Sequence, residues 1–95
     1  MGTATLVEIL AAKGQTAEAR AILDAALARS ATAWVSPANL ARMQFALGER
    51  DEAFAQLGRA LDLRDALAVV IAQDPLFDPF RADPRFEAYA RRVVY

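Results

Sequence analysis

The residues with the clearest chemical potential are three aspartates near the C-terminal end of the chain. Asp74, Asp78 and Asp83 lie close together in sequence, and each precedes a proline. Carboxylates in one short segment could bind Ca²⁺ or Mg²⁺, which need several converging oxygen ligands. No glycine provides a tight liganding loop here, and aspartate followed by proline is a preferred start of a helix. We therefore interpret these aspartates as helix caps and expect no metal site.

Other side chains could serve as acids, bases or nucleophiles. The acid–base candidates are Glu8 with Glu18 and Asp51 with Glu52, and the candidate nucleophiles are Ser30 and Ser36. The acids lie on helical faces that we expect to be exposed, with no oxyanion donor loop beside them. The chain has no histidine to activate a serine and no cysteine to supply a thiolate. We therefore expect no catalytic activity and no cofactor.

Composition narrows the class of partner. The chain has 95 residues, which is one small domain, and 56% of them are hydrophobic. The net charge is −1 and the arginines alternate with acids, which disfavours nucleic acid as a partner. Charges interrupt every apolar run before the ~18 residues that a membrane helix needs. With no signal-peptide pattern at the N-terminus, a cytoplasmic location is the default expectation.

The first third of the chain predicts two helices, over 3–13 and 16–29. Gly14 is expected to end the first in a left-handed conformation, and Thr16 to cap the second. Apolar residues recur at helical spacing in both. They are Leu6, Ile9 and Leu10 in the first helix, and Ala19, Ile22, Leu23, Ala26 and Leu27 in the second.

The middle third predicts a second pair of helices, over 36–48 and 50–61, after a connection at 30–35. Ser36 is a favoured N-cap and Pro37 a favoured first helical residue, because proline lacks only a donor that would be unused there. Gly48 ends the third helix as Gly14 ends the first. The inward residues of the fourth helix are Ala53, Leu57, Ala60 and Leu61.

The last third departs from this pattern. It predicts a short helix over 65–73, apolar on most sides, and a final helix over 83–94. The apolar stripe of the final helix consists of Phe86, Tyr89, Ala90, Val93 and Val94.

A shift that places Gly14 on Gly48 aligns the first pair of helices with the second. The other matching pairs that matter most are Leu6 with Leu40, Glu18 with Glu52, Leu23 with Leu57 and Leu27 with Leu61. Alanines match as well, at Ala4 and Ala38, Ala12 and Ala46, Ala19 and Ala53, and Ala26 and Ala60. Matches at a fixed spacing of ~34 residues indicate an array of similar helical units.

This pattern resembles the tetratricopeptide (TPR) repeat family. Alanines on the second helix of each unit allow close approach, and Leu6 and Leu40, with Leu23 and Leu57, are expected to fill the space between helices. Val7, Ala41 and Gln44 depart from the family pattern. The resemblance implies an all-α fold: antiparallel helical hairpins stacked as a short TPR-like solenoid with a C-terminal helical cap. We expect a single domain over 1–95, with unit one at 3–30, unit two at 36–62 and the cap at 63–95.

A narrower resemblance covers residues 34–94. The segments 34–37, 74–81 and 83–86 are similar to the ending of the C-terminal TPR regions of bacterial multidomain regulators, although Leu76 stands where arginine is usual. The resemblance implies that residues 63–95 close the array and that the chain belongs to a bacterial regulatory protein. It identifies neither the partner nor an upstream domain.

By the same resemblance, the inner residues of the first helix of each unit line a groove for a protein or peptide partner. The groove residues are Glu8, Ala12, Asn39, Arg42 and Phe45, with Ala4, Ala11, Ala38 and Ala46 beside them. Glu8 would repel a terminal carboxylate, which disfavours a chaperone-tail clamp. Asn39 also suits a capping role beside Ser36. The alternative is that two units curve too little to form a groove and that Phe45 belongs to the core.

Two functions from different classes follow. The first is a non-catalytic protein–protein interaction module, which presents a preformed helical surface to its partner. The second is a structural segment that caps a longer array or forms a homodimer and has no external ligand. The apolar helix at 65–73 and the end at 93–95 fit either a cap or a self-association surface.

Overall fold

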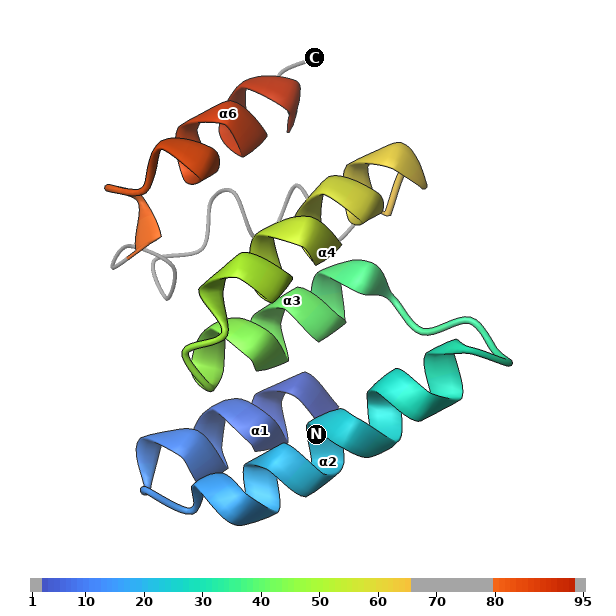
Figure 1. Ribbon diagram of the computed structural model, residues 1–95, viewed down its shortest axis with the longest axis vertical. Coiled ribbons are helices and arrows are strands. Elements are labelled where there is room, and N and C mark those ends of the chain that lie inside the picture. Colours follow the sequence, from blue (N-terminus) through green and yellow to red (C-terminus); the bar gives the residue numbers. More distant parts are fainter. Residues whose placement is uncertain (1–2, 66–79, 94–95) are drawn as a thin grey trace.

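The structure is a computed structural model that describes residues 3–65 and 80–93, and the regular elements of these residues are α-helices (Figure 1). The expected all-α class is confirmed for this part of the chain. The helices are α1 (Thr3–Ala12), α2 (Thr16–Ser30), α3 (Pro37–Ala46), α4 (Arg50–Asp62) and α6 (Pro84–Val93). The predicted helix over 65–73 lies outside the described residues, except for Asp65, as do Asp74 and Asp78.

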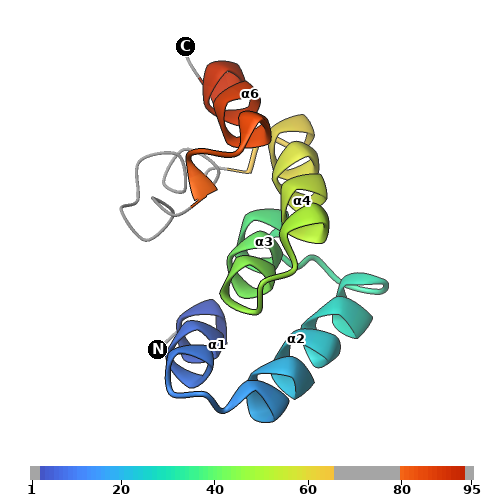
Figure 2. The ribbon, with the colours of Figure 1, turned by 60° about the vertical axis from the view of Figure 1, so that its left-hand side comes forward.

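The helices pack in chain order as successive layers, each against the one before it. α1 and α2 form one antiparallel hairpin, α3 and α4 form a second beside it, and α6 lies against α4 (Figures 1 and 2). α3 packs on α4 and also on both helices of the first hairpin. The first helices of the two hairpins begin at Thr3 and Pro37, the same interval that separates Gly14 from Gly48. α2, α4 and α6 also begin at this interval, at Thr16, Arg50 and Pro84.

α3 is buried on two opposite sides, and the two core clusters meet at it. Leu40 and Met43 belong to the cluster of the first hairpin, which also contains Ala4, Val7, Ala19, Leu23 and Ala26. On its other side α3 contributes Ala38, Ala41 and Phe45 to a cluster with Ala53, Leu57, Ala60, Phe86 and Tyr89. Ala38 and Ala41 allow α4 to approach α3 closely, whereas Leu40 and Met43 fill the gap toward the first hairpin.

The helix ends follow the local sequence closely. Gly14 and Gly48 have φ values of 80° and 77°, as expected for glycines that end helices. The Ser36 hydroxyl accepts a hydrogen bond from the Asn39 N–H, which confirms it as the N-cap of α3. The prediction that Thr16 caps α2 is wrong. The first helical hydrogen bond joins the Ala19 N–H to the Gln15 carbonyl, so Gln15 takes the cap position and Thr16 is already helical.

The expected role of Leu6 is also wrong. Leu6 is 39% exposed, whereas Leu40, its counterpart in the second hairpin, is fully buried. Leu40 is covered because α3 packs on the first hairpin, and no described helix covers the same side of α1. The inner side of α1 is formed instead by Ala4 and Val7.

Replacing two glycines of the second hairpin by alanine should change the free energy of unfolding in opposite directions. Gly48→Ala should lower the free energy of unfolding by ~1–2 kcal/mol, because it forces a Cβ into the left-handed conformation. Gly58→Ala should raise it by ~0.5–1 kcal/mol, because alanine favours the helix and its methyl group meets no atom within 4 Å. Urea unfolding followed by circular dichroism measures both, with Gly14→Ala expected to behave like Gly48→Ala. Equal stability of the Gly48 and Gly58 variants would contradict this account.

Candidate functional site

Glu8 and Arg42, two of the predicted groove residues, pair with each other. Arg42 Nη2 lies 2.6 Å from Glu8 Oε1, and both side chains are about four-fifths buried. The two residues are 34 positions apart, so this ion pair joins corresponding sites on α1 and α3. Arg42 is therefore already neutralised within the chain and is not a free cation for a partner.

Phe45, which was expected either in the groove or in the core, is a core residue. It is 4% exposed, and its ring lies edge-on to Phe54 with centroids 5.1 Å apart. Phe80, which lies just before α6, stacks on Phe45 at a tilt of 41° with centroids 4.4 Å apart. Of the remaining groove residues, Ala12 is exposed and Asn39 is half-buried. The structure thus brings Glu8 and Arg42 together but withdraws Phe45 from the surface.

Asp65 holds the start of α3 from a distant part of the chain. Its Oδ2 accepts a hydrogen bond from the Ser36 hydroxyl at 2.5 Å and another from the Ala38 N–H at 3.2 Å. A carboxylate at the N-terminus of a helix is stabilised by the unpaired N–H groups and by the helix dipole. Burial, assisted by the negative charge of Asp65, raises the pKa of the Tyr89 phenol. The sequence assigned Asp65 only to the start of a helix, because a contact between residues so far apart in the chain leaves no local signal.

A hollow lies where the ends of α1, α2 and α3 meet the connection between the hairpins. Its volume is about 420 Å³. It is lined by Thr3, Ala4, Ala26, Arg29, Trp34, Val35, Ser36, Asn39 and Met43. Trp34 is 67% exposed, the most of the three large hydrophobic side chains that stand out at the described surface. Sequence reasoning missed this site, although a lone tryptophan in the connection between the two predicted pairs of helices was the signal that could have found it.

A second hollow, of about 330 Å³, lies between α4 and α6. It is lined by Asp51, Phe54, Ala55, Gly58, Leu61, Arg85, Ala88, Tyr89 and Arg92. Its two arginines are both engaged. Arg92 Nη2 lies 2.8 Å from Asp62 Oδ1, and Arg85 Nη1 lies 2.6 Å from Asp51 Oδ1. These ion pairs join α6 to α4 on either side of an apolar floor.

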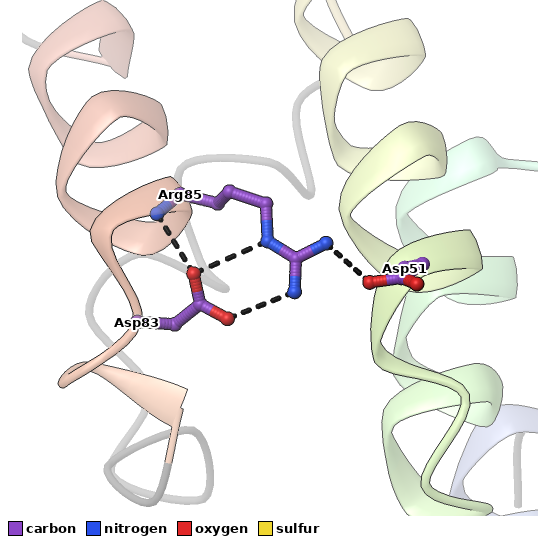
Figure 3. Close-up of polar contacts among 3 residues, drawn as sticks. All are labelled: Asp51, Asp83 and Arg85. Carbon is purple, nitrogen blue, oxygen red and sulfur yellow. Dashed lines mark hydrogen bonds and ion pairs between the residues drawn. The ribbon is translucent and has the colours of Figure 1, made fainter.

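Arg85 is the centre of a polar network that fastens the start of α6 (Figure 3). Its Nε and Nη2 contact the two carboxylate oxygens of Asp83 at 3.2 and 2.9 Å, while Nη1 reaches across to Asp51. The guanidinium also lies over the Phe54 ring, 4.6 Å from its centroid. Asp83 accepts a hydrogen bond from the Arg85 backbone N–H at 2.9 Å, which confirms its predicted role as a cap. Asp51 and Arg85 are 34 residues apart, like Glu8 and Arg42.

The described part of the chain offers neither a cluster of metal ligands nor a membrane span. Among residues 3–65 and 80–93, no cluster of three potential ligands from His, Cys, Asp and Glu could hold a metal ion. None of the helices described is long and apolar enough to cross a membrane. No family model, curated protein or solved structure matches the chain.

The Arg85 network makes a prediction for the titration of Asp83. Hydrogen bonds from the Arg85 side chain and then from its backbone N–H lower the pKa of Asp83 from 3.8 to about 2. Because the folded pKa is the lower one, this contact stabilises the fold above the ordinary pKa of 3.8, and its contribution is lost as the pH falls through about 2. Carbon-detected NMR titration should give the low value in the natural chain and a higher one in Arg85→Gln. An unshifted Asp83 in the natural chain would contradict the network.

Proposed function

We propose that this chain is a non-catalytic protein-interaction module of the helical-repeat type and that an acidic, extended segment of a partner docks beside Trp34. The hollow at Trp34 combines a preformed wall and an exposed aromatic ring, and Arg29 provides the single charged side chain in the part of its lining that the structure describes. Its volume lies within the ~300–1,000 Å³ typical of ligand sites. The first hairpin, the connection and the start of α3 each contribute part of the wall.

The correspondence of the two hairpins supports the repeat part of the proposal. Leu23 and Leu57 are both fully buried, and Gly14 and Gly48 take the same left-handed conformation. Helices that begin at a constant interval suit the TPR-like arrangement that the sequence resembles. Arrays of this kind present extended surfaces for binding other proteins.

The exposure of Trp34 is the observation on which the proposed docking site depends. Tryptophan and arginine are enriched among the residues that dominate binding energy at protein interfaces. Arg29 forms no ion pair with another described residue, so its charge is available to a partner. Because Arg29 is the only charged residue among the described residues that line the hollow, an acidic segment is the complementary occupant.

The predicted groove contributes to this site in part. Asn39 lines the hollow, and the Ser36 cap fixes its backbone N–H. Under this proposal its side-chain amide binds polar groups of the partner. Glu8 and Arg42 neutralise each other and hold α1 and α3 together beside this site. We therefore place partner recognition at the end of α3 that carries Asn39, and not at Phe45.

A second candidate function is structural, and the covering of Phe45 favours it. Phe80 lies on Phe45, and the Arg85 network fastens α6 to α4. Such contacts suit a segment that closes an array and has no external ligand. Under this alternative, Trp34 is an exposed side chain without a binding role.

Trp34 allows a direct test because it is the only tryptophan in the chain. Its fluorescence should change on titration with a capped peptide of sequence Gly-Xaa-Leu-Xaa-Leu-Xaa-Gly in which Xaa is glutamate. An exposed ion pair contributes up to ~1 kcal/mol, so replacing glutamate by glutamine should weaken binding up to ~5-fold, and lysine should weaken it further.

Charge reversal at Arg29 provides the decisive control. Arg29→Glu should invert the order of the three peptides, whereas Arg59→Glu, in the last turn of α4, changes the net charge equally and should preserve it. Inversion by both variants would mean that overall charge governs the signal. The absence of any fluorescence change with all three peptides would favour the structural alternative.

A further inference from the structure

The short segment that carries Trp34 belongs to no helix and is held at both of its ends. On the side of α2, the Ala33 N–H donates a hydrogen bond of 2.9 Å to the Arg29 carbonyl. On the side of α3, the Ser36 hydroxyl donates a hydrogen bond of 2.5 Å to Asp65 Oδ2. The second end is therefore fastened by a residue that lies beyond α4 in the sequence.

The contacts of Asp65 reach the wall of the hollow at Trp34. The same Oδ2 atom also accepts a hydrogen bond from the Ala38 N–H, and the Ser36 oxygen accepts one from the Asn39 N–H, each at 3.2 Å. Hydrogen bonds to a carboxylate are stronger than those between neutral groups. Ser36 and Asn39 line the hollow. Asp65 thus fixes part of this wall, although it is not among the described residues that line it.

The turn at the end of α4 brings Asp65 back to α3. The Asp65 N–H donates a hydrogen bond of 2.8 Å to the Ala60 carbonyl, and Arg64 between them has a φ of 56°. Among the residues that the structure describes, Arg64 is the only one other than glycine with a positive φ. Residues with a Cβ rarely adopt this conformation and remain in it where surrounding contacts hold them. The hydrogen bonds of Asp65 to the start of α3 are contacts of this kind, so the strained turn indicates that the position of Asp65 matters.

We propose that Asp65 is a positioning residue of the docking site, which holds the connection between the hairpins so that Trp34 is ordered before a partner binds. This inference rests on the proposed function, because it gives Asp65 a part in the same site. Ordering a binding segment in advance raises affinity, since the cost of ordering is then not incurred on binding. The negative charge of Asp65 has the wrong sign to attract an acidic segment, so Asp65 contributes through geometry and not through attraction.

The motion of Trp34 in the peptide-free chain tests the inference separately from the proposed function. The chain has one tryptophan, so time-resolved fluorescence anisotropy reports the rapid motion of this side chain alone. Asp65→Ala should increase the amplitude of fast depolarisation, because it removes both hydrogen bonds to the start of α3. Asp65→Asn loses the same charge but keeps an oxygen acceptor, so it should stay close to the natural chain. Asp62→Ala removes an equal charge, paired with Arg92 of α6, and should leave the motion of Trp34 unchanged.

Titration with the glutamate and glutamine peptides shows whether this positioning serves recognition. Asp65→Ala should bind both peptides ~2–10-fold more weakly than Asp65→Asn, which is the cost of ordering about one side chain on binding. The factor should be the same for the two peptides, because the two variants carry the same charge. A direct effect of the charge of Asp65 would instead change the affinity for the glutamate peptide equally in both variants and leave no difference between them.

Each outcome bears on a different part of the inference. Unchanged motion of Trp34 in folded Asp65→Ala would overturn it and leave Asp65 as a cap of α3 alone, as would equal affinities of the two variants. Ser36→Ala, which keeps the bond of Asp65 to the Ala38 N–H, replaces Asp65→Ala if that variant does not fold. If no peptide binds the natural chain while Asp65→Ala still frees Trp34, the proposed function fails and the positioning of Trp34 by Asp65 stands.

Discussion

The burial of α3 on two sides is the constraint on which the rest of the structure depends. Its large side chains, Leu40 and Met43, pack into the first hairpin, and its small ones, Ala38 and Ala41, admit α4. Burying a leucine or methionine side chain contributes ~1.5–3 kcal/mol, so this one helix supplies much of what holds the layers together. A ten-residue helix is marginal alone in water, and α3 is stable because it is enclosed.

Polar contacts add to the apolar core by fixing the start of α3 and the start of α6. Asp65 returns to the start of α3, and Arg85 joins α6 to Asp51 of α4. The surface of the second hairpin that contacts α6 differs from the surface of the first hairpin that contacts α3. Buried Gln44 and half-buried Gln56, whose amide oxygens accept no hydrogen bond from another described residue, occupy the positions that correspond to Leu10 and Ile22 of the first hairpin. The buried rings of Phe86 and Tyr89 hold α6 on this side, and the exposed ion pairs at its edges add at most ~1 kcal/mol each.

Local sequence features predicted the helices of the described residues well, because the causes of helix formation and termination are local. Gly14, Gly48 and the Ser36–Pro37 pair mark the helix ends through backbone conformation and capping alone. The burial of side chains was predicted less well, since the apolar spacing of α1 does not reveal which of its sides is covered. The contact of Phe80 with Phe45 and the role of Asp65 depend on tertiary contacts between segments far apart in the sequence, which local patterns do not encode. The hollow at Trp34 has the same origin, because its wall comes from three helices and a connection.

Native-state hydrogen exchange of backbone amides tests most directly whether α3 is the central element. Amides in a helix covered on both sides open only with the global unfolding of the domain, whereas those in a helix covered on one side also exchange through local opening. We expect the interior amides of α3 to exchange slowest and those of α1 to exchange measurably faster. Equal protection of α1 and α3 would contradict the account, because it would mean that α1 has no open side.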